Sequence, residues 1–196
     1  LAGLHTEFTG EIMLQRKILS AYSHAELSTQ VAWQGELPPT EFGLTVGQRL
    51  ELAAQQTVEK LTKTLNYLEL MPLRERALGE LSSGERQRVE SAALMMRDCP
   101  VWLMDEPTAH LDMRHQVDCL RLIKQQAKKG RLIFAVLHDL QQAAAVADVV
   151  VLLDGKGGVQ VGQAQHLLTT EQLEPIFKVK LQGSGRNLMP SYTDEL

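Results

Sequence analysis

Val101-Trp102-Leu103-Met104-Asp105-Glu106-Pro107 is the segment from which the architecture can be predicted. Four consecutive apolar residues, without the alternation of a half-exposed strand, are typical of a parallel strand that is buried on both faces. Asp105 and Glu106 follow directly at its carboxyl end, where open α/β sheets place their ligands. The pattern predicts an α/β fold with a parallel sheet and two acidic side chains at the ligand-binding edge.

Three short motifs flank this segment. Leu81-Ser82-Ser83-Gly84-Glu85 precedes it, and Ala109-His110-Leu111-Asp112 and Leu137-His138-Asp139 follow it. We expect Gly84 to open a helix, and a helix N-terminus attracts phosphate through its free N–H groups and partial positive charge. An isolated Ser-Ser-Gly is more often an ordinary helix cap. The phosphate interpretation therefore depends on the motifs that follow it.

In this order the four motifs resemble the ATP-binding cassette (ABC) ATPases, in which they form the signature loop, the Walker B strand, the D-loop and the switch histidine. Gln34, 47 residues before Leu81 (81 − 34), stands at the place of the family's Q-loop glutamine. The resemblance runs from Leu1 to about Leu181. It implies a P-loop NTPase-like α/β domain with a parallel sheet core and a helical subdomain.

The resemblance also implies roles for the matching residues. Glu106 would orient or activate the attacking water, and His138 would sense the γ-phosphate. Asp105 would hold Mg²⁺ through water, with Gln34 contacting the metal and its water. Phosphoryl transfer needs mainly positioning and charge neutralisation, which this arrangement supplies. The residues expected at ATP are Gln34, Ser82, Ser83, Gly84, Glu85 and Asp112; Ser83, Glu85 and Ala109 replace the family's usual Gly, Gln and Ser.

Each of these residues also has a purely structural interpretation. Gln34 could be a solvated loop residue that follows a strand, Asp112 could simply cap a helix, and a histidine such as His138 at a strand end is more often structural than catalytic. The Asp105–Glu106 pair could be a solvated strand end. The joint spacing of the motifs favours the functional interpretation.

The family's phosphate loop, G-x-x-x-x-G-K-[ST], does not occur in the 196 residues. Leu1-Ala2-Gly3-Leu4 resembles the last turn of the helix that follows this loop, so we expect an N-terminally truncated cassette; the alternative is a cassette that degenerated without the loop. Gly155-Lys156-Gly157 is a predicted hairpin turn, because no Ser/Thr or helix follows it. We expect these residues alone neither to bind ATP tightly nor to hydrolyse it, and to be marginally stable, because an absent central strand would leave sheet edges and apolar surface bare.

We predict a partial ABC ATPase domain over 1–182, with its helical subdomain at about 36–98, and a flexible tail over 183–196. Thr45 and Gln48 fit a capping box. The predicted strands are 10–14, 28–33, 131–137, 149–153 and 159–162, and a last helix spans 169–177. Three apolar helix stripes are predicted. The first consists of Val46, Leu50, Ala53 and Ala54. The second consists of Val58, Leu61, Leu65 and Leu68, in a helix that stops near Met71-Pro72, and the third consists of Val117, Leu120 and Ala127, in a helix that stops at Gly130.

Composition limits the classes of function. A net charge of -4 argues against bulk nucleic-acid binding, which requires a concentrated positive field. The longest apolar run, Val149–Leu153, is far shorter than the roughly 20 residues that cross a bilayer, so other subunits would supply any membrane-spanning helices. Cys99 and Cys119 lack metal-ligand and redox spacing, which favours two buried thiols in a reducing cytosol.

Within the class, the sequence resembles most the ATPase subunits of importers for iron-siderophore complexes, haem or cobalamin (vitamin B12), with cobalamin preferred. The residues that carry this are Leu44-Thr45-Val46 and Leu173–Val179. The resemblance implies a homodimer with ATP and Mg²⁺ beneath two transmembrane permease subunits, at the cytoplasmic face of the inner membrane, served by a solute-binding protein. Two alternatives remain: a non-transport ABC ATPase, and a catalytically incompetent fragment that only docks on a partner.

Overall fold

The computed structural model describes residues 9–35, 37, 43–53 and 57–191, and the chain divides into two compact units, Leu1–Val136 and Leu137–Leu196. Among the described helices, none has the length and apolar character that crossing a membrane requires. The predicted ATPase domain over 1–182 and its helical subdomain stay predictions.

A three-stranded parallel sheet forms the centre of the first unit. It consists of β3 (Val31–Gln34), β4 (Val101–Asp105) and β5 (Leu132–Val136), in that spatial order. The register pairs Gln34 with Met104 and Asp105 with Val136, so the carboxyl ends of the strands meet at one edge. The first four residues of β4 are buried, which confirms the predicted parallel strand.

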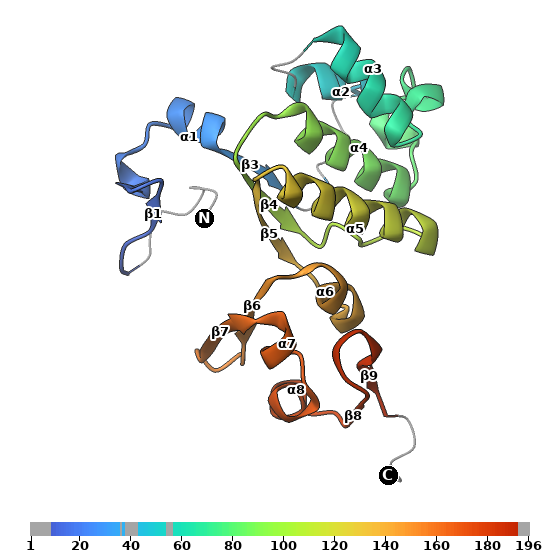
Figure 1. The fold of residues 1–196 in the computed structure, drawn as a ribbon. Coiled ribbons are helices and arrows are strands. Elements are labelled where there is room, and N and C mark those ends of the chain that lie inside the picture. Colours follow the sequence, from blue (N-terminus) through green and yellow to red (C-terminus); the bar gives the residue numbers. More distant parts are fainter. Residues whose placement is uncertain (1–8, 36, 38–42, 54–56, 192–196) are drawn as a thin grey trace. The chain divides into compact units, whose positions relative to one another are not determined.

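Two helices pack against the sheet face that carries Trp102. They are α4 (Ser83–Met96) and α5 (Met113–Lys128), which lie side by side in Figure 1. Trp102 is fully buried, and both cysteines are buried free thiols, as predicted. The shared core consists of Ala32, Leu94, Cys99, Trp102, Met104, Leu111, Cys119 and Ile123.

The predicted stripe on α5 is wrong for Val117 and Ala127, which are exposed, whereas Leu120 is half-buried against the core. The buried positions are Cys119, Leu122, Ile123 and Gln126. These positions follow the i, i+3, i+4, i+7 spacing of one helix face, so the helix is rotated from the predicted stripe. The predicted stop is confirmed, because Gly130 has φ +91° and its N–H donates to the Ala127 carbonyl at 2.9 Å.

The helical insert consists of α2 (Val46–Ala53) and α3 (Val58–Tyr67), which pack on α4 in Figure 1. The Thr45–Gln48 capping box is confirmed: the Thr45 N–H donates to Gln48 Oε1 at 3.0 Å, and the Gln48 N–H donates to Thr45 Oγ1 at 3.2 Å. Ala54 lies outside the described residues. The core here consists of Val46, Leu50, Leu61, Leu65, Leu68, Leu70, Leu78, Leu81, Val89, Ala92, Ala93 and Met96.

The second predicted stripe needs two corrections. Val58 is 79% exposed at the first turn of α3, so the buried stripe begins at Leu61. The helix ends at Tyr67, before Met71-Pro72, and Glu69 just beyond it has φ +55°, outside the helical region. Short 3-10 helices cover Leu19–Ala21, Met71–Leu73 and Leu78–Glu80.

The predicted strand over 28–33 is partly wrong. Residues Ser28–Gln30 form the last turn of α1 (His24–Gln30), and only β3 is extended. A capping box starts this helix: the Ser23 N–H donates to Glu26 Oε2 at 2.8 Å, and Ser23 Oγ accepts from the Glu26 N–H at 3.2 Å. This local cap outweighs the β propensity of Thr29.

The predicted strand over 10–14 is shorter than expected. Only β1 (Met13–Leu14) is extended, and it pairs antiparallel with β2 (Lys17–Ile18). Gln15 and Arg16 have φ values of +47° and +66°, the conformation of a tight two-residue hairpin turn.

β5 is less buried than predicted. Leu132, Phe134 and Val136 are 64%, 42% and 42% exposed, so the prediction of a buried strand over 131–137 is wrong for alternate residues. Among the described residues of this unit, β5 pairs only with β4 and is an edge strand. The exposed residues alternate along the strand, so they lie on one face of β5.

The second unit contains the predicted hairpin and last helix. The tail prediction is wrong for 183–191, because Leu188 is 1% exposed within the core of this unit and Met189 pairs with Gln182; residues 192–196 lie outside the described part. The elements are α6 (Leu140–Val146), β6 (Val149–Leu153), β7 (Val159–Gln163), α7 (Ala164–Leu167), α8 (Thr170–Phe177), β8 (Leu181–Gln182), a 3-10 helix (Gly185–Asn187) and β9 (Met189–Pro190).

One largely buried ion pair fixes the insert to α4. The Arg49 guanidinium donates to both carboxylate oxygens of Glu90, at 3.0 and 2.5 Å, and the side chains are only 26% and 10% exposed. We expect Arg49→Ala to lower the free energy of unfolding by about 3 kcal/mol, because the Glu90 carboxylate then stays buried without its partner. Urea denaturation measures the change.

The matched control is Lys63→Ala. Lys63 pairs with Glu59 at 2.6 Å, but both side chains are about three-quarters exposed. Such exposed helical pairs contribute only about 0.3–0.5 kcal/mol. Equal losses in the two variants would contradict the importance of the Arg49–Glu90 pair.

Candidate functional site

Gln34 and Asp105 are the last residues of the neighbouring strands β3 and β4. Gln34 pairs in register with Met104, the residue before Asp105. The Gln34 residue is 3% exposed, and neither its Oε1 nor its Nε2 has a hydrogen-bond partner. A buried amide without partners costs roughly 1–3 kcal/mol per unsatisfied group. Gln34 is therefore a strand-end residue with unused hydrogen-bonding capacity, and its alternative as a solvated loop residue is wrong.

The two acidic residues leave β4 in different backbone conformations. Asp105 is the last strand residue and is exposed. Glu106 is also exposed and has φ +45°, in the left-handed region that non-glycine residues seldom adopt. Its N–H donates to the Val136 carbonyl of β5 at 3.2 Å. Such strained conformations cluster at functional sites.

A tight turn links Glu106 to α5. The Ala109 N–H donates to the Glu106 carbonyl at 2.9 Å, and His110 has φ +63°. Asp112 caps α5, because its carboxylate accepts from the His115 N–H at 2.8 Å and lies 2.9 Å from His115 Nδ1. The hydrogen bond from the His115 backbone holds the pKa of Asp112 below its usual value. The structural role of Asp112 is thus clear, and its contact with ATP stays a prediction.

The signature segment starts α4 with a second capping box. Ser82 Oγ accepts from the Glu85 N–H at 3.2 Å and donates to Glu85 Oε2 at 2.9 Å, while the Ser82 N–H donates to the same oxygen at 2.8 Å. The backbone hydrogen bond from Ser82 holds the pKa of Glu85 below its usual value. The residue that replaces the family's glutamine therefore serves as the acidic member of the cap. Ser83 occupies the first helical position and is exposed.

Gly84 lies against the turn that follows β4. A Cβ atom at this position would lie 2.7 Å from the His110 carbonyl oxygen, closer than real Cβ contacts. The glycine therefore lets the tip of α4 approach the backbone of the turn. The structure thus brings Gly84 against the turn that contains His110.

The donors at the edge of the sheet suit magnesium with few protein ligands. The described residues hold no group of three or more His, Cys, Asp or Glu side chains that could enclose a metal ion. Mg²⁺ usually takes one or two carboxylates and completes its octahedron with water and substrate phosphates. Asp105 fits that pattern as an exposed carboxylate, and the buried Gln34 amide would have to turn outward to reach the same ion.

His138 belongs to the second unit. It follows the end of β5 by two residues and is exposed. The next residue, Asp139, caps α6 by accepting from the Gln141 and Gln142 N–H groups at 2.7 and 3.0 Å. The role of His138 at the γ-phosphate stays a prediction.

Two site residues escaped sequence reasoning. Gln87 reaches the Glu106 carbonyl from α4, and His115 contacts Asp112. Gln87 could have been noticed as a polar residue on α4, a helix that is buried over much of its length. Nothing in the spacing identified His115.

Comparison with known sequences identifies the class of protein. The profile of the family described as "ABC transporter" matches residues 1–109. An uncharacterised ABC transporter ATP-binding protein of Haemophilus influenzae is 35% identical over 189 residues, covering 91% of this chain and 72% of that protein. The chain therefore belongs to the ATP-binding subunits of the ABC transporter family, which hydrolyse ATP.

Two further relatives have names that state a transported solute. A hemin import ATP-binding protein of Shewanella denitrificans is 33% identical, covering 91% of this chain and 75% of that protein. A probable siderophore transport system ATP-binding protein of Bacillus subtilis is 27% identical, covering 93% and 70%. In fold, the chain resembles the ATP-binding subunit of an ABC transporter with a TM-score of 0.74 at 23% identity, covering 89% of this chain and 75% of that one.

The cap at Ser82 can be tested by truncating its hydroxyl. We expect Ser82→Ala to lower the free energy of unfolding by about 1 kcal/mol, because α4 loses its N-cap. Ser83→Ala is the matched control, and it should change stability little because Ser83 makes no cap. Equal effects in a urea titration would contradict the cap.

Acid titration adds a second readout for this cap. Because the folded pKa of Glu85 is lowered, its stabilising share is present above its ordinary pKa and is lost as the pH falls through the folded value. Ser82→Ala should weaken this pH dependence without abolishing it, because the backbone N–H of residue 82 still donates to the Glu85 carboxylate.

Proposed function

We propose that this chain belongs to the ATP-hydrolysing subunit of an importer for metal-chelate solutes such as haem or iron-siderophore complexes. The supporting observation is that relatives named for hemin and siderophore import align with about nine-tenths of this chain. Cobalamin import is the narrower form of the proposal and rests on the sequence resemblance alone.

The geometry suggests a division of labour at the nucleotide. Asp105 and Gln34 would hold Mg²⁺ at the edge of the sheet, and the metal would neutralise charge on the transferred phosphate. The exposed Glu106 carboxylate, on its fixed backbone, would orient the attacking water. Ser82 and Gly84, at the N-terminus of α4, would present N–H groups and a hydroxyl to the nucleotide of a second subunit.

This assignment of Ser82 has a chemical condition. Its hydroxyl already donates to Glu85, so a bound phosphate has to replace the carboxylate as acceptor. Closure of the dimer on nucleotide would then loosen the capping box. The proposed assembly is a homodimer beneath two permease subunits at the cytoplasmic face of the membrane, with a solute-binding protein delivering the solute.

A non-transport ABC ATPase is the weaker alternative. A solved archaeal ribosome recycling factor is 26% identical but covers only 71% of this chain. A docking role without catalysis would leave the strained Glu106 and the unpartnered Gln34 unexplained.

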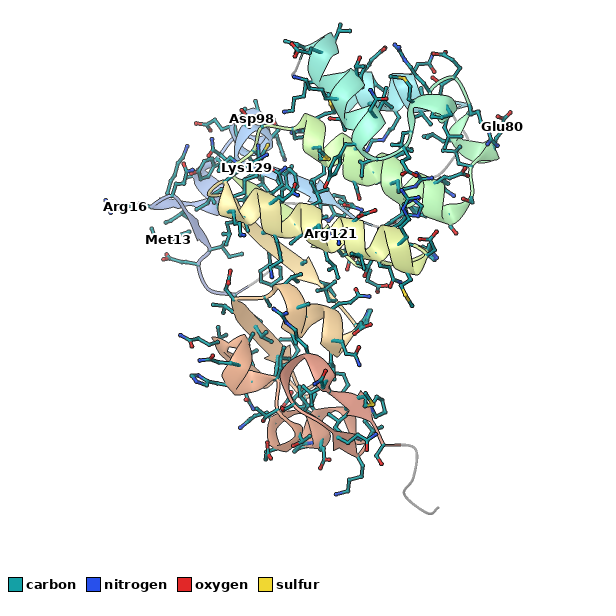
Figure 2. All side chains as sticks on the ribbon, turned by 45° about the vertical axis from the view of Figure 1, so that its right-hand side comes forward. Met13, Arg16, Glu80, Asp98, Arg121 and Lys129 are labelled. Carbon is teal, nitrogen blue, oxygen red and sulfur yellow. The ribbon has the colours of Figure 1, made fainter. Side chains whose placement is uncertain are left out.

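The function can be tested by fusing the 196 residues to the part of the S. denitrificans protein outside its match with this chain. We expect the fusion to hydrolyse ATP, and Glu106→Gln to reduce the rate at least about 100-fold, because the group that handles the attacking water is lost. Glu80→Gln is the control: Glu80 has a 63% exposed side chain and lies at the rim of the helical insert in Figure 2. Equal rates in both variants would contradict the role of Glu106.

Two further arms separate the parts of the proposal. The 196 residues alone should hydrolyse no ATP above background, and hydrolysis that depends on Glu106 would overturn that expectation.

A strain lacking its haem-import ATPase and carrying the fusion should grow on haem as its iron source. Parallel cultures on a ferric siderophore, and uptake of cobalamin, distinguish the solutes.

A further inference from the structure

The backbone at Glu106 is strained and is fixed from several directions. Glu106 and His110 both have positive φ, although neither is glycine. The N–H of Glu106 is bonded to β5, and its carbonyl accepts from the Ala109 N–H at 2.9 Å. A carbonyl oxygen has two lone pairs, so one further donor can be accommodated there.

Gln87 of α4 supplies that second donor. Its Nε2 donates to the Glu106 carbonyl at 3.1 Å, across 19 residues of sequence, and the residue is only 3% exposed. A buried side-chain amide is unfavourable unless it is hydrogen-bonded. Packing alone would be served better by an apolar residue, so the hydrogen bond to Glu106 accounts for a glutamine at this position.

We propose that Gln87 is a positioning residue that holds the peptide group of Glu106 and thereby directs the Glu106 carboxylate. The catalytic meaning of this contact rests on the proposed function. Gln87 lies one helical turn after Ser83, and Gly84 packs on His110 in the same turn that Glu106 begins. On this account the N-terminus of α4 would meet the nucleotide of the second subunit. The same helix, through Gln87, would hold Glu106, which acts at the nucleotide of its own subunit. A displacement of α4 would reach the backbone of Glu106 through this hydrogen bond and through the contact of Gly84 with His110.

Amide hydrogen exchange of the 196-residue chain tests the contact without requiring ATPase activity. Gln87→Met keeps the approximate volume and removes the donor. We expect exchange in the peptide spanning 106–111 to become about fivefold faster, the change expected from the loss of one net hydrogen bond. Peptides from β3 and β4 should keep their protection.

Two variants separate positioning from general packing. Gln126→Met is the matched control, since Gln126 is a buried glutamine, 6% exposed, whose amide oxygen accepts from Arg131. It should leave the peptide spanning 106–111 unchanged. Gln87→Glu should protect this peptide at low pH, where a protonated carboxyl can donate to the Glu106 carbonyl, and lose the protection as the carboxyl ionises.

The outcomes are decisive in each direction. Faster exchange in Gln87→Met confined to 106–111, with rescue of Gln87→Glu at low pH, supports the proposal. Unchanged exchange, or equal loosening in Gln126→Met, overturns it. If the Gln87→Met variant does not fold, the test rests on Gln87→Glu alone. The measurement is then the exchange rate of the peptide spanning 106–111, divided by its intrinsic rate at each pH, as the introduced carboxyl ionises. Failure of Glu106→Gln to affect ATP hydrolysis would instead contradict the proposed function and leave this result standing.

Discussion

The double-sided burial of β4 is the constraint on which the rest of the first unit depends. Trp102 and Met104 face α4 and α5, while Val101 and Leu103 are buried as well. A strand buried on both faces has to expose polar residues beyond its end. Asp105 and Glu106 emerge there together with Gln34 from the neighbouring strand, so packing of the core and placement of the site have the same cause.

Helix caps then determine how the loops around this edge are built. The Ser82–Glu85 box starts α4, and Asp112 starts α5. Between them, Gly84 and Gln87 hold the turn after β4 at a short distance from α4. The Ser82 hydroxyl, which accepts from a free backbone N–H group in this structure, is also the group proposed to meet phosphate. Such a loop can exchange internal hydrogen bonds for bonds to a ligand.

The sequence predicted most reliably what local chemistry determines. The run Val101–Met104 and the Thr45–Gln48 box were both predicted and are both present. Predictions failed where tertiary contacts decide. The face of α5 that meets the sheet could not be known from its several possible stripes, and the exposure of β5 depends on what covers each face of the strand.

The site was predictable as a set of residues, but its internal contacts were not. Motif order identified Gln34, Asp105 and Glu106, because each lies at or directly after the end of a strand. Only the structure shows that the Gln34 amide is buried without a partner and that the Glu106 backbone is strained. The contact between Gln87 and Glu106 joins two elements through a side chain and a backbone carbonyl, and no periodicity reports such a pair.

Paramagnetic broadening by Mn²⁺ and ATP tests most directly whether the strand ends form one metal–nucleotide edge. In amide spectra of the fusion protein, with Mn²⁺ replacing Mg²⁺, broadening should be strongest at Gln34, Asp105 and Glu106 and weakest at Lys129, which follows the far end of α5. Signals at the strand ends that stay sharp while nucleotide is bound would contradict the account.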